Sequence, residues 1–377
     1  MWVLLKESQE LGAGEMQENT KNYRAMMGLL LSSCTLFIVF IFSLSAVSCA
    51  AQSINPDKPH HTNSGFRNPD LKDDHGFFDF LRWRWNRLWI DIPSGDSYDF
   101  PVAKNNPEFL RANQTQKTLT WIGHATMLFQ IDGVNILTDP HFSERTSPVQ
   151  WAGPKRVVPP GIALEDLPPI HIVFISHDHY DSLDKNSILN LYKREDGKNT
   201  RFIVPLGMKR WFASIGVPSA IEMDWWDEYQ MDSLKIIATP MQHWGKRSPF
   251  SRNKHLWASW IVLSDDFRFY FGGDTGFSPH FKEAGEKFGP FDLALLPIGA
   301  YEPRWFMKNH HINPEEAVKA HKDLRARKSI AMHWGTFPLT DEPLDEPPRR
   351  LKAALKNEDL SDEDFLVLMH GETIILD

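Results

Sequence analysis

The stretch from Ile170 to Asp184 constrains this chain most, because a largely apolar run gives way abruptly to clustered polar side chains. Its first half, Ile170 to Ile175, is rich in β-branched residues, which predicts a short buried strand. His177, His179 and Asp181 follow at intervals of two residues, on the loop that leaves this strand. An extended loop sends alternate side chains the same way, so the three can converge. Such a donor set favours zinc; a solvated polar loop is the simpler alternative.

Three more candidate donors, His243, Asp274 and His333, each follow closely on a predicted strand. Catalytic residues belong on loops held by a rigid sheet, whereas core histidines would lie within the strands. The pattern therefore predicts two metal ions that share one carboxylate. We assign His177, His179 and His243 to the first ion, Asp181 and His333 to the second, and Asp274 to a bridge between them.

The length of 377 residues and the hydrophobic content of 42% allow a large core and indicate one α/β domain of about 300 residues. The dipeptide Asp132-Gly133 between two apolar runs is a strong hairpin signal. Further strands are expected at Leu119–Ile122, Met127–Ile131, Asn135–Leu137, Lys235–Thr239, Trp257–Leu263, Phe267–Phe271, Leu293–Pro297 and Ser329–Met332. Helices are expected at Asp184–Tyr192, with Asp184 as the N-cap, and at Asn313–Leu324.

The charge and the cysteines exclude several kinds of function. The 377 residues carry a net charge of −8, which is not the basic footprint of a nucleic-acid-binding protein. The two cysteines, Cys34 and Cys49, lie in an apolar N-terminal segment. The globular part therefore has no thiol for an internal disulfide, a metal ligand or a nucleophile.

Residues 1–51 are interpreted as a targeting segment. Lys21 and Arg24 precede an apolar run that ends in small residues near position 48. A cleaved signal peptide, a lipoprotein site at Cys49 and an uncleaved membrane anchor all fit, and either Met1 or Met16 fits as the start. Each predicts an exported or membrane-associated protein, in the periplasm, at the outer or plasma membrane, or in the secretory pathway.

Residues 52–66 are interpreted as a polar linker, in which His60 and His61 are expected to be solvated, and residues 67–377 as the globular domain. Aromatic residues and arginines interleave from Phe77 to Trp89. This stretch predicts either a face that lies on a membrane surface or an amphipathic segment packed against the domain.

Several motifs resemble the metallo-β-lactamase superfamily, whose sign is His-x-His-x-Asp-His followed by a later His, Asp and His. Within it they are similar to the family of N-acyl-phosphatidylethanolamine-hydrolysing phospholipases D. The stretches that carry this resemblance are Trp121–Thr126, Leu137–Pro140, Gly153–Arg156, Gln242–Trp244, Gly273–Gly276, Ile298–Lys308, Asn313–Ala317 and His333–Phe337. The run from Ile298 to Lys308 is long and unusual, which makes the resemblance specific.

The resemblance implies an αββα sandwich with the metal site on the strand-end loops. It implies a zinc-dependent phospholipase D that acts at a membrane surface and releases phosphatidic acid and an N-acylethanolamine. The family has a histidine ligand of the second metal where this chain has Ser182. A hydroxyl is a weaker donor than an imidazole, so we expect one tight zinc and a second, weaker one.

The resemblance also assigns roles to individual residues. Asp274 and Asp181 become catalytic, with Asp274 orienting the attacking water, and Tyr180 and His311 become contacts of the substrate phosphate. His124, Asp139 and Ser182 become residues that support the metal ligands. Two alternatives remain: another hydrolase on the same scaffold, such as a lactonase or a small-molecule phosphodiesterase, and a metal-poor binding protein. The oligomeric state is left open.

Overall fold

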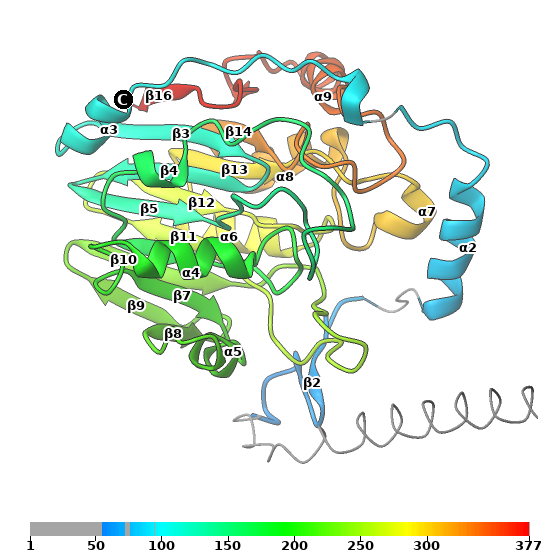
Figure 1. Ribbon diagram of the computed structural model, residues 1–377, viewed down its shortest axis with the longest axis horizontal. Coiled ribbons are helices and arrows are strands. Elements are labelled where there is room, and N and C mark those ends of the chain that lie inside the picture. The colour runs from blue at the N-terminus through cyan, green and yellow to red at the C-terminus, as the bar shows by residue number, and fades with distance from the viewer. Residues whose placement is uncertain (1–54, 72–75, 94, 377) are drawn as a thin grey trace, which may run out of the picture. The chain divides into compact units, whose positions relative to one another are not determined.

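Two seven-stranded sheets form the framework of the computed structural model, which describes residues 55–71, 76–93 and 95–376 (Figure 1). The predicted targeting segment, residues 1–51, lies outside these residues. Within the described ranges, none of the helices combines the length and the hydropathy needed to cross a membrane.

The first sheet has the order β16 (Thr373–Leu376), β3 (Lys117–Gly123), β4 (Thr126–Ile131), β5 (Val134–Thr138), β6 (Ile172–Phe174), β7 (Arg201–Pro205) and β8 (Ala220–Met223). The predicted hairpin is confirmed, because Asp132 and Gly133 have φ of 50° and 74° and join the antiparallel pair β4 and β5. From β5 to β8 the pairing is parallel, and β3 runs the same way as β5.

The second sheet has the order β15 (Phe365–Leu366), β14 (Lys328–Met332), β13 (Leu293–Pro297), β12 (Arg268–Phe271), β11 (Ser259–Leu263), β10 (Leu234–Thr239) and β9 (Glu228–Met231). Only β9 and β11 run against the other strands of this sheet. The carboxyl ends of β10, β12, β13 and β14 therefore share one edge.

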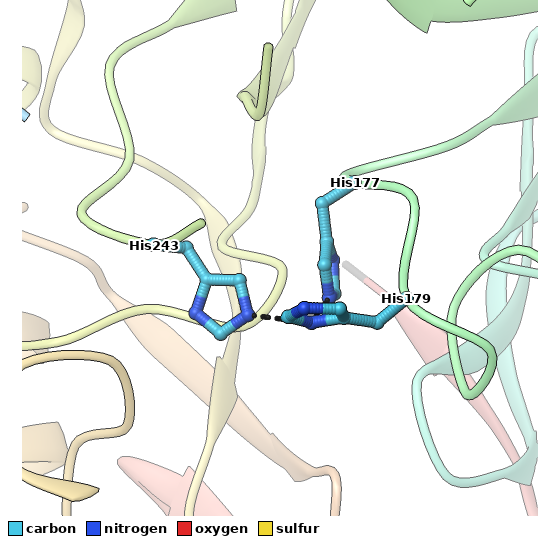
Figure 2. Close-up of side chains that lie close together, drawn as sticks. All are labelled: His177, His179 and His243. Atoms are coloured by element: carbon cyan, nitrogen blue, oxygen red, sulfur yellow. Dashed lines mark hydrogen bonds between the residues drawn. The ribbon is translucent and has the colours of Figure 1, made fainter. Parts of the chain in front are cut away.

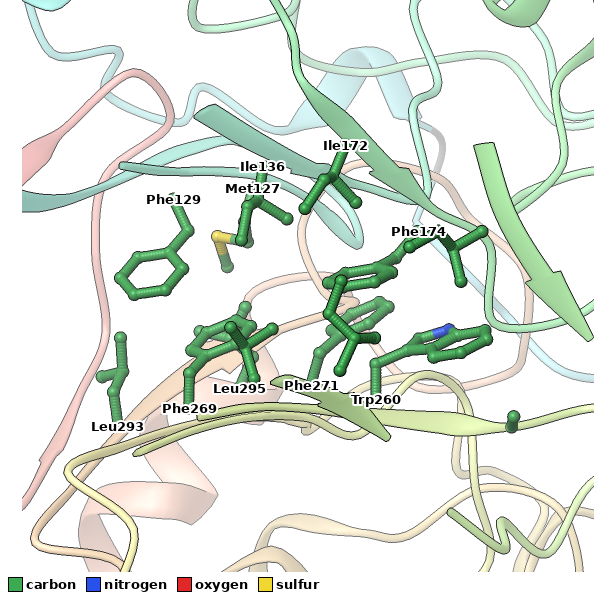
Figure 3. Packing of buried hydrophobic residues seen from close by; sticks show 14 of the residues in the cluster. Met127, Phe129, Ile136, Ile172, Phe174, Trp260, Phe269, Phe271, Leu293 and Leu295 are labelled. Carbon is green, nitrogen blue, oxygen red and sulfur yellow. The ribbon is translucent and has the colours of Figure 1, made fainter. Parts of the chain in front are cut away.

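Alternating side chains of the two sheets fill the space between them (Figure 3). From the first sheet, Met127, Phe129 and Phe174 point into this core, and from the second sheet Trp260 and Phe269 meet them. Phe174 stacks on Trp260 with ring centroids 5.2 Å apart. Such close packing makes the sandwich a rigid support for its loops.

Helices cover both outer faces, which confirms the expected αββα sandwich. The first sheet carries α3 (Pro107–Ala112), α4 (Lys185–Lys193) and α5 (Lys209–Ser214), and the second carries α6 (His280–Phe288), α8 (Pro314–Asp323) and α9 (Glu346–Asn357). The remaining helices in the described part of the chain are α2 (Phe77–Arg87), α7 (Arg304–Met307), η1 (Gly95–Ser97) and η2 (Leu164–Asp166). Asp184 caps α4, as predicted, by accepting hydrogen bonds from the N–H groups of Asn186 and Ser187.

The expectation that His60 and His61 are solvated is wrong. These residues belong to a small ribbon, β1 (His61–Thr62) and β2 (Gly65–Phe66), and both side chains are buried. Their Nε2 atoms lie 2.7 and 2.9 Å from the carboxylate oxygens of Asp224, and Nζ of Lys58 lies 2.7 Å from the same carboxylate. An ionised partner far along the chain makes their burial favourable, and local sequence patterns do not reveal such a partner.

Candidate metal centre

The candidate donors come from loops that follow strands sharing one orientation in each sheet. His124 follows β3, Asp139 follows β5, His177 follows β6, His243 follows β10, Asp274 follows β12 and His333 follows β14. Parallel strands end at the same edge of a sheet, so the fold gathers these loops. Short spacings in sequence thus become a convergent site in space.

The imidazoles of His177, His179 and His243 form the first group (Figure 2). Nδ1 of His179 lies 2.8 Å from Nε2 of His177 and 3.1 Å from Nε2 of His243. His243 donates its Nδ1–H to the carbonyl oxygen of His310, 2.9 Å away, because a carbonyl only accepts. Its Nε2 therefore presents a lone pair to the group.

A hydrogen-bonded chain orients His177. Asp139 accepts the hydroxyl hydrogen of Ser176, with 2.5 Å between the oxygens. The serine oxygen is then free to accept the Nδ1–H of His177, 2.9 Å away, which leaves Nε2 of His177 with its lone pair. The structure thus connects Asp139 to His177 through a residue that the sequence analysis did not single out.

Burial keeps these imidazoles neutral. It lowers the pKa of His177 and His243 well below the usual value and also lowers the pKa of His179. Lone pairs on neutral rings repel one another unless a cation or a proton lies between them. A tetrahedral ion with metal–nitrogen bonds of about 2.0–2.1 Å would separate the three nitrogens by roughly 3.4 Å, close to the spacing found here.

Carboxylates and two further histidines form the second group. Oδ2 of Asp181 lies 3.2 Å from Nε2 of His333 and 3.3 Å from Nε2 of His124. Oδ2 of Asp274 lies 2.8 Å from Nε2 of His333 and 3.9 Å from Nε2 of His177, between the two groups. Neither oxygen of Asp274 makes a hydrogen bond of normal geometry with the described residues, although the carboxylate is fully buried.

The electrostatics of the second group also suit a cation. Burial would lower the pKa of His333, but the carboxylates of Asp274 and Asp181 raise it to about 10. Burial raises the pKa of Asp274, against the effect of His333. Without a metal, these groups hold a proton among them, and a divalent cation would displace it. The buried carboxylates and the converging imidazoles fit a divalent metal ion.

The structure also locates the residues assigned to the substrate and to support. The Tyr180 hydroxyl donates to the carbonyl of Arg247, 2.7 Å away, so its hydrogen is already used. The ring of His311 lies 5.6 Å from that of His333, and its Nδ1 makes no hydrogen bond with the described residues. Oγ of Ser182 is buried near the Asp139 carboxylate and makes no hydrogen bond of normal geometry with the described residues. His124, expected only to support ligands, lies among them.

Sequence reasoning missed several residues that shape the site. Nδ2 of Asn68 donates to the carbonyl of His243, 2.7 Å away, and its Oδ1 accepts from the Trp257 indole. Nη1 of Arg247 donates to the carbonyls of Asp178 and Leu183, on either side of Asp181. No local pattern marks Asn68 or Arg247, because their partners are distant in sequence. Ser176 had one signal, its position directly before His177.

Comparisons with known proteins agree with this geometry. Residues 134–334 match the family model of the beta-lactamase superfamily domain. The chain is 46% identical over 267 residues to N-acyl-phosphatidylethanolamine-hydrolyzing phospholipase D 1 of Caenorhabditis elegans. The aligned region covers 67% of this chain and 74% of that protein. It is 38% identical to the mitochondrial N-acyl-phosphatidylethanolamine-hydrolyzing phospholipase D of Saccharomyces cerevisiae, over 62% of this chain and 50% of that protein. The metallo hydrolase Igni18 of Ignicoccus hospitalis superposes with a TM-score of 0.54 at 25% identity, over 70% of this chain and 99% of that one.

Proposed function

Since the chain belongs to the beta-lactamase superfamily and has the fold and donor groups of a metal-dependent hydrolase, we propose that it is a zinc-dependent phosphodiesterase of phospholipase D type. Its substrates are N-acyl-phosphatidylethanolamine-like lipids, and its products are phosphatidic acid and an N-acylethanolamine. The observation that carries the proposal is the pair of adjoining donor groups joined by Asp274, in a chain with 46% identity to an enzyme of that name.

The choice of zinc rests on the donor chemistry. Three imidazoles and a carboxylate suit zinc better than magnesium or calcium, which prefer oxygen donors. Bound zinc supplies Lewis acidity and lowers the pKa of a water to about 7. The chain's own part is to hold its donors in fixed tautomers, through the Ser176 and His310 contacts. The buried Asp274 carboxylate, which lies between the two donor groups, would orient the attacking water.

A substrate-facing side of the centre is supplied by His311. Its ring lies 5.2 Å from that of His243, and one of its ring nitrogens lies within 4.8 Å of donor atoms of His243 and Asp274. Its Nδ1 makes no hydrogen bond with the described residues. A phosphate oxygen placed there would receive a hydrogen bond if Nδ1 carried the proton. Tyr180 contributes differently from the expectation: its ring packs under the Arg247 guanidinium at 4.3 Å.

A cavity of about 530 Å³ lies beside this arginine. Lys185 and Arg247 line it with one carboxylate, that of Asp184, and with the rings and apolar chains of Tyr180, Trp211 and Ile215. The mixture of cationic and apolar groups suits part of an anionic lipid.

A membrane surface is the second part of the proposal, and helix α2 supports it. Trp83 anchors the helix by stacking on Phe306 of α7 at 5.3 Å and donating to Asp341. Trp85 of the helix is 65% exposed, and Trp89, just beyond its end, is 78% exposed. Exposed tryptophans beside arginines are typical of helices that lie in the membrane interface. Helix α2 packs against α7 through Trp83 and Phe306, and α7 ends at Met307, four residues before His311 of the site. The proposed membrane-facing helix is therefore anchored close to the metal centre.

A substrate screen on the purified full chain tests the proposal. With zinc, it should release phosphatidic acid from N-acyl-phosphatidylethanolamine in mixed micelles, and His243→Ala should abolish this. His321→Gln is the matched control, because His321 is buried in α8 with Ser329 as its partner. Turnover of only a soluble diester or a lactone would replace the lipid substrate with another hydrolase activity. A folded, zinc-loaded chain that turns over none of the three would contradict the proposal.

A further inference from the structure

We infer that His124 is the imidazole donor that completes the second metal position. It would replace the histidine ligand that the resembling family has where this chain has Ser182. This inference deepens the proposed metal centre and rests on it. The sequence led us to expect one tightly bound zinc and a second zinc bound more weakly because residue 182 is a serine. With His124 as a ligand, both zincs should bind tightly. With His124 counted, the second position has two imidazoles and two carboxylates, from His124, His333, Asp181 and Asp274.

The first support is the equivalence of His124 and His333. Their Nε2 atoms lie 3.3 and 3.2 Å from the same oxygen, Oδ2 of Asp181. Their rings lie 4.0 Å apart, both are at most 2% exposed, and Nδ1 of each makes no hydrogen bond with the described residues. In its contact with Asp181, His124 therefore matches His333, which in addition lies 2.8 Å from Oδ2 of Asp274.

The second support is the backbone that delivers this side chain. His124 has a φ of 54°, a left-handed conformation that costs about 1 kcal/mol or more for a residue other than glycine. Three hydrogen bonds hold it there. Its N–H donates to Oγ1 of Thr336 at 2.8 Å, and its carbonyl accepts from the Trp121 indole and from the His333 N–H, both at 3.0 Å. The last bond joins the backbones of His124 and His333.

Ser182 does not compete for this place. Its oxygen is buried without a hydrogen bond of normal geometry, and a neutral hydroxyl is a weak donor to zinc. The competing explanation is that His124 only orients Asp181, by donating Nε2–H to the carboxylate. A ligand needs a lone pair at Nε2, whereas an orienting residue needs a hydrogen there, so a substitution can separate the two roles.

Glutamine at position 124 makes this separation, because its amide N–H can replace the imidazole donor to Asp181 but offers zinc no nitrogen lone pair. The full-length chain is loaded with zinc and desalted, and zinc per chain is measured by mass spectrometry of the metal. Wild type should hold two, His124→Gln one, and the double variant His124→Gln with Ser182→His two again. The affinity of the second zinc should fall at least about tenfold in His124→Gln, or about 1.4 kcal/mol.

Ser182→Ala is the matched control and should keep two zincs, because Ser182 is not a donor. It also carries the test if His124→Gln does not fold, since loss of the second zinc in Ser182→Ala would overturn the inference. Two zincs in His124→Gln, or only one in wild type, would overturn it as well. The zinc count uses no substrate, so the inference can fail while lipid hydrolysis is confirmed, and the reverse.

Discussion

Replacing Asp224 by asparagine tests how the N-terminal ribbon is held against the sandwich. The two oxygens of Asp224 accept from four donors: Lys58, His60 and His61 of the ribbon segment and the N–H of Trp225. The ammonium of Lys58 already lies 2.7 Å from this carboxylate, which makes the cluster an ion-paired clamp although its histidines resemble a metal site.

The magnitude follows from the contacts that asparagine cannot keep. One amide oxygen can serve His60 and Trp225 on the Oδ1 side, and the Lys58 and His61 bonds on the Oδ2 side are lost. The Lys58 side chain is 34% exposed, so its pair counts for about 0.5–1 kcal/mol, and the buried His61 bond for about 1.5–3 kcal/mol. The loss is about 2–4 kcal/mol. With an unfolding entropy of about 0.7 kcal/mol/K for some 320 residues, the melting temperature should fall by about 3–6 °C.

Calorimetry at pH 7 measures this change in melting temperature. Asp232→Asn is the control, because it makes the same change of charge on an exposed turn. Burial alone would raise the pKa of Asp224, but the hydrogen bonds from His60 and Lys58 hold it well below its usual value. A lowered folded-state pKa stabilises the fold above the unfolded pKa, about 3.9, and this stability is lost as the pH falls further. The gap between wild type and variant should therefore persist at pH 5, begin to narrow below about pH 4, and close only as the pH approaches the lowered pKa of the folded state. A variant that melts within 1 °C of Asp232→Asn at pH 7 would refute the clamp.

The remaining predictions concern the site and its supports. Removing the metal with a chelator should lower the melting temperature. Zinc at 100 times its dissociation constant should then raise the free energy of unfolding by about 2.7 kcal/mol. An unchanged melting temperature would count against a resident metal. Gly273→Ala should destabilise the chain and weaken zinc binding, because Gly273 has a φ of 61° and a Cβ there would lie 2.6 Å from Cβ of Ser176, whose hydroxyl orients His177. Unaltered zinc affinity in that variant would separate Ser176 from the site. Asn313→Ala should cost about 1 kcal/mol through loss of the α8 cap without changing the zinc content; a changed content would mean that α8 shapes the site.

The predictable part of the site depends on short-range periodicity. His177, His179 and Asp181 lie on one loop at two-residue intervals, and a buried strand before them fixes where that loop begins. His243 and His333 needed one further rule, that parallel strands end at the same edge. The rule held because β10, β12 and β14 run in the same direction.

Other features depend on contacts that span most of the chain. The burial of His60 needs Asp224, and the hold on His243 needs Asn68, 175 residues earlier. The position of His124 depends on a left-handed backbone that Thr336 and His333 stabilise from another sheet. Local patterns predict a turn at such a residue, but they do not predict which way its side chain points.

Diffraction at the zinc absorption edge tests the metal centre most directly. A crystal of the zinc-loaded chain should show two anomalous peaks about 3.5–4 Å apart. One should lie against His177, His179 and His243, and the other against Asp181 and His333, with Asp274 between them. Absence of a peak among these donors, or a peak only between His60, His61 and Asp224, would contradict the account.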